Sequence, residues 1–316
     1  MPDSPLPTDP TGAAPLPDVT VVIATRDRPE LMREALEAVR AQEHDAVVRT
    51  VLVFDQSEPD LSLVDDDPRR PVEVVANARR PGLAGARNTG IERATTPLVA
   101  FCDDDDVWLP GRLAPQVAAL SAAPRSVLAT CGIRVEQGGR EHDRVLEQTE
   151  VVLLDLLADR HTELHPSTFL LRREALVELG MVEEDVPGGF GEDYDLLLRC
   201  ARDAPVLHVP VPLVRVRWGS QSYFTRRWET MAAGLAWMLE RHPEFEDSPR
   251  GSARVRGQVA FAHAALGHRR EAARWARGAV RRRPTEPRAV LALGVAAGVL
   301  PPARVVAVLH RFGRGI

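Results

Sequence analysis

Residues 97–110 read PLVAFCDDDDVWLP, a short apolar segment that runs directly into four consecutive aspartates. The pattern predicts a fully buried strand over 97–102, because a brief apolar run bounded by turn signals is typical of one. Adjacent carboxylates at the end of a buried strand oppose one another's ionisation unless a cation offsets their charge. One interpretation is therefore a site for Mg²⁺ or Mn²⁺, which prefer oxygen ligands. The other is a solvated acidic loop or a helix-capping cluster.

Similar apolar segments lie upstream and alternate with a helical pattern. Strands are predicted at 19–24, 50–54 and 72–76, and residues 29–42 carry apolar side chains at helical spacing. This alternation is typical of a parallel sheet with helices on its faces. Ligands of such sheets bind outside the carboxyl ends of the strands. We therefore expect the loops after these strands to meet the aspartates in one crevice.

The composition indicates one main domain with a smaller annex. The chain has 316 residues, 44% of them hydrophobic, and its 40 Lys and Arg positions are all arginine. The absence of lysine excludes Schiff-base chemistry and the phosphate loop that ends in lysine. Three widely spaced cysteines suit a reducing compartment, and residues 1–17 lack the features of a secretory signal. We expect a cytoplasmic protein with a flexible leader.

Residues 224–316 differ from the rest in charge and pattern. They carry 17 arginines against seven acidic residues. Helices are predicted at 258–266 and 270–282, and Gly267 between them makes the pair resemble one tetratricopeptide-like hairpin. We expect a solvated basic face, with peripheral contact to anionic lipid at the inner face of the membrane, or to a protein, as the alternative. No motif supports nucleic-acid binding.

Four segments resemble, in order, the motifs of family 2 glycosyltransferases. They begin at Val19, Val51, Pro81 and Gly191, and they read VTVVIATRDRPELMREALEAVRAQ, VLVFDQS, PGLAGARNTGIERATTPLVAFCDDDDVWLPGRL and GEDYDLLLRCA. The resemblance implies a GT-A fold, an α/β architecture in which helices flank a mostly parallel sheet. We expect this domain over residues 18–223, after a leader at 1–17 and before an all-helical extension at 224–316.

The resemblance also implies a reaction, an inverting transfer of a sugar from a nucleotide diphosphate, expected to be a UDP-sugar, to an acceptor hydroxyl. Asp103 and Asp105 would be the outer acids of the DxD motif that holds Mn²⁺ or Mg²⁺, with Asp105 as the direct ligand. Asp104 takes the variable middle position. The residues implied to lie by the base or diphosphate are Thr25, Arg28, Asp55 and Arg87.

Glu192 and Asp193 resemble the family's acceptor-side motif, whose Asp is the general base. An acceptor hydroxyl is a poor nucleophile until its proton is removed in the transition state. Without the upstream motifs, both would be interpreted as acids that the helix dipole favours at a helix N-terminus.

The segment after the next strand departs from the family pattern. Relatives often carry a histidine there, in a Tyr-Arg-x-His type segment that reaches the metal or diphosphate, whereas this chain has VRVRWGSQS from Val214 to Ser222. Arginine suits phosphate geometry. Either Arg217 contacts the diphosphate directly, or the closing loop works differently.

Simpler interpretations remain for single residues. Arg28 and Arg87 fit a helix surface, Asp55 fits a turn cap, and a tryptophan such as Trp218 is usually core packing. His165 either lines the acceptor side or is a core or capping residue; the second interpretation is favoured, and the residue is left out of the site.

Two other functions compete with glycosyl transfer. A sugar-1-phosphate nucleotidyltransferase would carry a glycine-rich basic loop after the first strand, where this chain has TRDRP from Thr25. A catalytically silent sugar-nucleotide-binding scaffold would bind a donor without turning it over. For a transferase, the acceptor is a glycan, a lipid carrier or a small metabolite.

Overall fold

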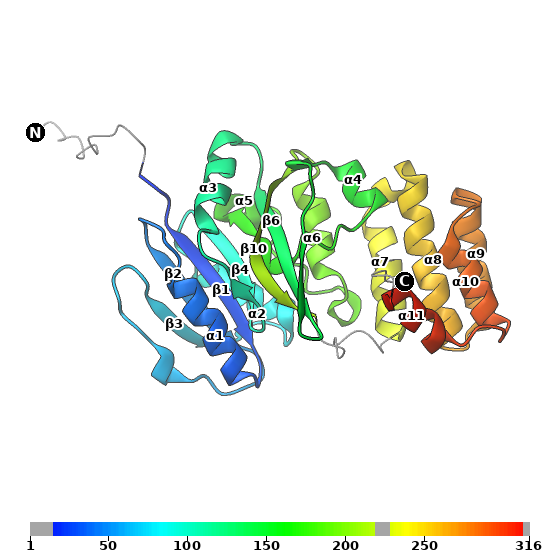
Figure 1. Ribbon diagram of the computed structural model, residues 1–316, viewed down its shortest axis with the longest axis horizontal. Helices are drawn as coiled ribbons and strands as arrows, with labels where there is room; N and C mark the ends of the chain where they lie inside the picture. The colour runs from blue at the N-terminus through cyan, green and yellow to red at the C-terminus, as the bar shows by residue number, and fades with distance from the viewer. Residues whose placement is uncertain (1–14, 219–227, 312–316) are drawn as a thin grey trace, which may run out of the picture.

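The computed structural model describes residues 15–218 and 228–311 (Figure 1). Three expected features lie wholly or mostly outside the described residues. They are the leader, the domain boundary between residues 223 and 224, and residues 219–222 of the segment that departs from the family pattern. In Figure 1 a layered α/β part forms the left and centre of the molecule, and a stack of helices extends to the right.

Ten strands of the described chain form one mixed sheet. Its order is β3-β2-β1-β4-β9-β6-β10-β5, with β7 paired to β6 and β8 paired to β10. The first four strands are mutually parallel, so their carboxyl ends lie at one edge, as the sequence predicts. The bounds are β1 (Val19–Thr25), β2 (Val48–Phe54), β3 (Val72–Ala76), β4 (Leu98–Asp103), β5 (Val107–Trp108), β6 (Leu128–Gln137), β7 (Arg140–Arg144), β8 (Glu150–Val151), β9 (Leu170–Arg172) and β10 (Val206–Arg217).

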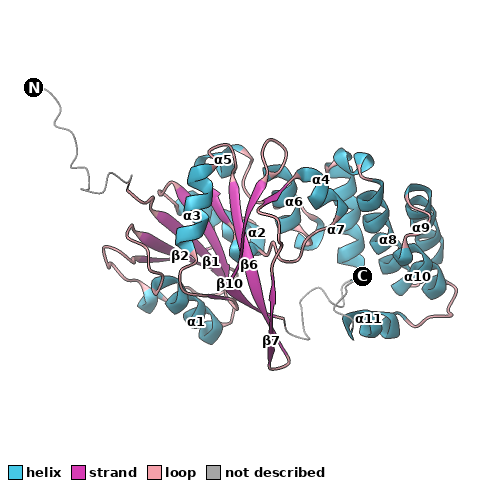
Figure 2. Cartoon of the chain, turned by 45° about the horizontal axis from the view of Figure 1, so that its top comes forward, coloured by secondary structure: helices cyan, strands magenta, loops and turns pink. Residues whose placement is uncertain are grey.

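Helices cover both faces of the sheet (Figure 2). On β1, Val21 and Ile23 pack with α1 (Pro29–Arg40) and α3 (Leu113–Ala122). Val22 points the other way, into the core that contains α2 (Leu83–Arg93) and α6 (Glu192–Cys200). Burial on both faces explains why the strands are apolar at nearly every position. The short helices are α4 (Leu153–Ala158) and α5 (Arg173–Glu178), with one-turn helices η1 (Leu61–Leu63), η2 (Pro166–Thr168), η3 (Pro187–Gly189) and η4 (Pro243–Asp247).

The C-terminal region is helical, as expected. Met238 of the first helix and Val255 of the second lie in the same core as α6, and Phe261, Ala276 and Ala292 form a further core between the later helices. The predicted hairpin is present, with Gly267 at φ +79° between its two helices. The bounds are α7 (Trp228–Arg241), α8 (Pro249–Ala265), α9 (Arg269–Arg282), α10 (Pro287–Ala296) and α11 (Pro302–Arg311).

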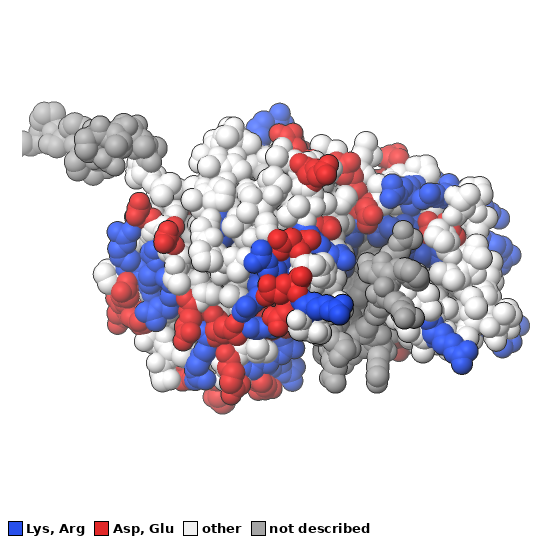
Figure 3. Space-filling model, viewed as in Figure 1, with Lys and Arg blue, Asp and Glu red and all other residues white. Residues whose placement is uncertain are grey.

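The described helices include none that is long and apolar enough to cross a membrane. Charge is distributed unevenly over the face shown in Figure 3: acidic and basic side chains are mixed over the α/β part, and basic side chains prevail over the C-terminal helices.

Buried polar bonds join α6 to the C-terminal helices. The Tyr194 hydroxyl accepts a hydrogen bond from Arg254 Nη2 at 2.9 Å and donates to the carbonyl of Leu156. The next residue, Asp195, lies 2.8 Å from His242 Nε2. Because buried polar groups must be paired, these contacts fix the orientation of α6, whose first two residues are Glu192 and Asp193.

Helix α8 also approaches α4 closely, and this contact requires glycine. A Cβ atom on Gly251 would lie 2.0 Å from the carbonyl oxygen of Leu157, whereas one on Gly278 of α9 would meet its nearest atom at 3.6 Å. We expect Gly251→Ala to lower the free energy of unfolding by about 1–3 kcal/mol through overpacking. Gly278→Ala should leave it unchanged or raise it by up to about 1 kcal/mol. Urea denaturation of both variants checks this, and equal effects would contradict the packing of α8 on α4.

Candidate active site

The carboxyl ends of β1, β2 and β4 bring three predicted site residues together. Thr25 ends β1, and its carbonyl accepts a hydrogen bond from the Asp55 N–H at 2.9 Å. Asp103 ends β4 and pairs in register with Ala24 of β1. The three loops therefore meet at one edge of the sheet, as the strand pattern predicts.

Asp104 and Asp105 contact the loop that follows β1. The Thr25 hydroxyl donates to Asp104 Oδ2 at 2.8 Å, and Arg28 Nη1 donates to Asp104 Oδ1 at 3.2 Å and to Asp105 Oδ2 at 2.9 Å. Burial raises the pKa of Asp104 to about 6 despite these hydrogen bonds. Arg28 therefore partly neutralises the acidic loop, and it is not simply a helix-surface residue.

Arg87 of α2 is buried between the two acidic motifs. Its Nη2 donates to Asp103 Oδ1 at 2.6 Å, and its Nη1 donates to Glu192 Oε1 at 3.2 Å. The side chain is only 3% exposed, so the helix-surface interpretation is wrong. Burial, with the neighbouring Asp193 charge, raises the pKa of Glu192 to about 7 although Arg87 favours its ionised form.

The fourth aspartate meets a histidine that the sequence analysis leaves out. Asp106 is 1% exposed and accepts a hydrogen bond from the Ser167 hydroxyl at 2.5 Å. His165 Nδ1 lies 3.3 Å from Asp106 Oδ2. One ligand atom from each of Asp103, Asp106 and His165 lies within 4.8 Å of the others. His165 does cap η2, as one interpretation expects, but it also belongs to this cluster.

Asp55 lies beside a cavity at the ends of β2 and β3. Its carboxylate accepts hydrogen bonds from Asn77 at 2.8 Å, Gln56 at 2.9 Å and the Gly82 N–H at 3.0 Å. Burial raises its pKa, but these bonds outweigh that effect and the pKa lies below its usual value. Asp55 thus links β2 to the start of α2 rather than capping a local turn. The adjacent cavity measures 410 Å³ and is lined by Phe54, Gln56, Ser57, Glu58, Ala76 and Asn77.

Asp193 is paired with an arginine outside the recognised motifs. Arg160 Nη2 donates to Asp193 Oδ2, and the Tyr194 N–H donates to Oδ1 at 2.8 Å. Burial is the largest single effect and raises the pKa of Asp193. The charge and hydrogen bond of Arg160, together with the charges of Arg87 and His165, outweigh it, so this pKa lies below its usual range. Arg160 follows α4 in a short loop, where no sequence pattern indicates its partner.

Arg217 reaches the acidic loop, but its guanidinium is already engaged. Its Nη2 donates to both carboxylate oxygens of Glu34 on α1 at 2.6 Å, and its Nη1 donates to the Asp105 carbonyl at 3.2 Å. Glu34 also accepts from Arg215 at 2.7 Å. In this structure Arg217 therefore contacts the main chain of the acidic loop. To contact a diphosphate, its guanidinium would have to release the Glu34 carboxylate.

Residues 20–180 match the sequence family described as Glycosyl transferase family 2. The chain belongs to this family. It is therefore a glycosyltransferase, as the four motifs predict, and the match ends before Glu192 and Asp193.

Relatives and solved structures agree with this assignment. The amylovoran biosynthesis glycosyltransferase AmsE of Erwinia amylovora is 27% identical over 215 residues, 66% of this chain and 79% of that protein. TarS of S. aureus, residues 1–349, superposes with a TM-score of 0.60 at 16% identity over 94% of this glycosyltransferase and 92% of that chain. The Pyrobaculum calidifontis mannosyltransferase PcManGT, solved with GDP-Man and Mn²⁺, gives 0.57 at 21% identity over 92% and 82%. The expected GT-A fold is confirmed.

The raised pKa of Glu192 predicts a pH dependence of stability in metal-free buffer. Its pKa is about 7 in the fold against an ordinary 4.5, so the folded state holds this proton more tightly than the unfolded state. That contribution to stability is present below about pH 4.5 and is lost as the pH rises through about 7. We therefore expect Glu192→Gln to unfold at a higher temperature than the wild type above pH 7, with little difference near pH 4. The exposed Glu178→Gln is the control, and an equal shift in both variants would contradict the burial effect.

Proposed function

We propose that this glycosyltransferase moves a sugar from a nucleotide diphosphate to an acceptor hydroxyl in the crevice between Asp55 and Asp193, with inversion at the anomeric carbon. The observation that carries the proposal is Arg87, which joins the acidic loop to the acceptor-side acids through Asp103 and Glu192. This supports a donor-side site at the acidic loop and a base next to Glu192, close enough together for an in-line displacement.

The proposed donor is a UDP-sugar, with its base at Asp55. A carboxylate has about four lone-pair positions, and three donors occupy Asp55, so one position remains for the base. The 410 Å³ cavity beside it supports this placement. Solved neighbours hold UDP-GlcNAc and GDP-Man, so both uridine and guanosine donors belong in the first assays.

The acidic loop fits a divalent cation, Mn²⁺ or Mg²⁺. Carboxylate oxygens with an imidazole are ligands that Mn²⁺ accepts, and Asp103, Asp106 and His165 already offer them close together. The family resemblance instead implies Asp103 and Asp105 as the metal ligands. Asp103 therefore belongs to both possible ligand sets. When bound, the cation would stabilise charge on the departing diphosphate. Thr25, Arg28 and Asp104 would then surround the phosphates, and Arg28 would supply a second positive charge.

Asp193 is the proposed general base. Its carboxylate is buried and held by Arg160 and the Tyr194 N–H, which fixes the oxygen that would accept the acceptor's proton. Attack from the side of Asp193, opposite the diphosphate, inverts the anomeric carbon. Glu192 would hold Arg87 in place beside it.

We further propose that residues 18–223 form the catalytic domain and that 224–316 form a helical extension of a cytoplasmic enzyme. The basic helices of this extension support peripheral contact with an anionic membrane or a protein. A polybasic surface contributes about 1 kcal/mol per Lys or Arg close to anionic lipid.

The base assignment predicts a separation of binding from chemistry. Asp193→Asn should lower the rate of sugar transfer by about 10²- to 10⁴-fold while leaving the dissociation constant for UDP within a few-fold of wild type. Product formation by mass spectrometry and UDP binding by calorimetry check the two parts. Asp159→Asn, an exposed acid near Arg160, is the control. Transfer by Asp193→Asn at the wild-type rate would exclude this residue as the base.

The ligand assignment can be tested by Mn²⁺ binding in the presence of UDP. Asp103→Asn should weaken binding under either ligand set. His165→Ala should weaken it by at least about tenfold if the histidine is a ligand, whereas the exposed His268→Ala should not. Unchanged Mn²⁺ affinity in His165→Ala, together with a loss in Asp105→Asn, would assign the ion to Asp103 and Asp105.

A further inference from the structure

Arg160 offers more hydrogen-bond donors than its described partner uses. A guanidinium has five N–H donors, and among the described residues Arg160 donates only through Nη2, to Asp193. Its side chain is 40% exposed, while that of Asp193 is 9% exposed. The remaining N–H groups of Arg160 have no hydrogen-bond partner among the described residues, and they lie beside the proposed base, where an acceptor must approach.

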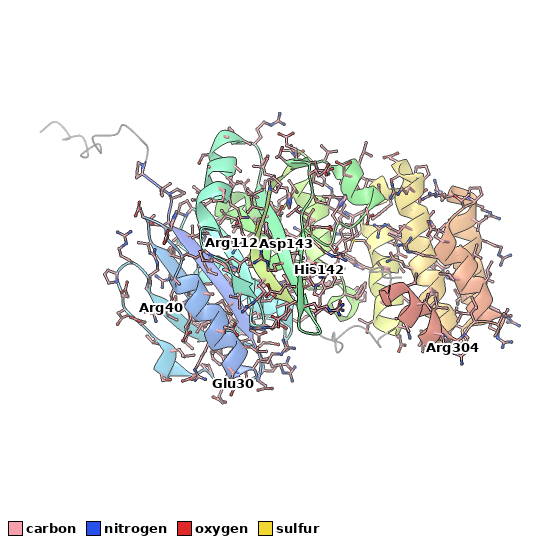
Figure 4. The ribbon with its side chains drawn as sticks, in the orientation of Figure 1. Glu30, Arg40, Arg112, His142, Asp143 and Arg304 are labelled. Atoms are coloured by element: carbon pink, nitrogen blue, oxygen red, sulfur yellow. The ribbon has the colours of Figure 1, made fainter. Side chains whose placement is uncertain are left out.

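A second arginine contacts the same loop. Arg144 of β7 donates from Nη1 to the Thr162 hydroxyl at 2.9 Å, and its guanidinium lies 4.6 Å from the ring centre of Trp218. Within residues 15–218 and 228–311, Arg144 makes no ion pair with a carboxylate. Its positive charge therefore has no described counter-ion. Figure 4 labels His142 and Asp143 on the same strand, near the centre of the molecule, and the His142 ring meets Trp218 edge-on at 6.5 Å.

These contacts connect the base to the acidic loop. Thr162 lies two residues from Arg160, Arg144 bridges Thr162 to Trp218, and the neighbouring Arg217 donates to the Asp105 carbonyl. We name Arg144, Arg160 and Trp218 the arginine wall. Its two guanidinium groups and one aromatic ring lie along the contacts that run from the proposed base to the donor-side loop.

Proton transfer to the proposed base would leave the positive charges of Arg160 and Arg144 without a counter-ion among the described residues. When the acceptor O–H proton moves to Asp193, the acceptor oxygen bonds to the anomeric carbon, and the electron pair of the broken C–O bond leaves with the nucleotide diphosphate. Neutralised Asp193 no longer balances Arg160, and Arg144 has no described counter-ion from the start. An anionic group on the acceptor would balance both, and it would draw Arg160 away from the base.

We propose that the acceptor is an acidic saccharide or polyol whose carboxylate or phosphate, close to the attacked hydroxyl, binds Arg160 and Arg144. An apolar sugar face would pack on Trp218. Arginine matches both anions because its planar fork pairs with carboxylate and phosphate oxygens. This inference names the acceptor class of the proposed function and rests on it.

The test compares matched probes on the full chain with UDP and Mg²⁺ bound, because Mg²⁺ is diamagnetic and compatible with NMR. Glucuronate and glucose form one pair, and glycerol 3-phosphate and glycerol form the other, so the two arms separate carboxylate from phosphate recognition. Binding is followed by saturation-transfer difference NMR with wild type, Arg160→Gln and Arg144→Gln. The controls are the exposed Arg250→Gln, beside the same loop, and Arg140→Gln, on the same strand as Arg144.

We expect at least one acidic probe to bind at least about tenfold more tightly than its neutral partner. That preference should fall severalfold in Arg160→Gln and in Arg144→Gln, and it should persist in both controls. Equal binding of acidic and neutral probes, no acidic binding at all, or a preference that survives either Arg160→Gln or Arg144→Gln would each overturn the inference. Release of nucleoside diphosphate from a sugar donor is measured in parallel, and its absence for every donor would instead contradict the proposed function.

Discussion

The ion pairs of Arg87 hold the acidic residues of the candidate site together. This guanidinium is 3% exposed and lies between Asp103, at the end of β4, and Glu192, at the start of α6. Removing Arg87 would leave both carboxylates without this partner, and breaking a buried ion pair in this way typically costs about 3–5 kcal/mol. One arginine therefore sets the position of the sheet relative to α6, and so of the donor-side acids relative to the acceptor-side acids. It lies on α2, not on β4 or α6.

Burial disfavours the ionised form of the carboxylates around Arg87. Burial raises the pKa of Asp104 to about 6 and that of Glu192 to about 7. Arg28 and Arg87 offset only part of this cost. A further positive charge would stabilise the ionised carboxylates, and a divalent cation at the acidic loop would supply that charge. Strongly perturbed groups in a cleft are typical of functional sites rather than of surface loops, which is consistent with the role of the family.

Much of the architecture was accessible from local sequence patterns. Apolar runs and helical spacing predicted the parallel strands and the C-terminal hairpin, because burial on both faces leaves a continuous apolar signal. Side-chain pairs between residues far apart in the sequence leave no such local pattern. Glu34 meets Arg217 from 183 residues away, and Arg160 reaches Asp193 from a short loop. A histidine before a proline is typical of a cap, and His165 is one. Only the fold brings it to Asp106.

The central claim is that the acidic loop and its surroundings turn over a nucleotide-sugar. It is tested most directly by incubating the purified chain with a panel of UDP- and GDP-sugars, with Mn²⁺, with Mg²⁺ or with a chelator, and measuring the nucleoside diphosphate released. Metal-dependent release from at least one donor, lost with the chelator, is the predicted result. No release from any donor, together with no metal-dependent donor binding, would contradict the account and favour a silent scaffold.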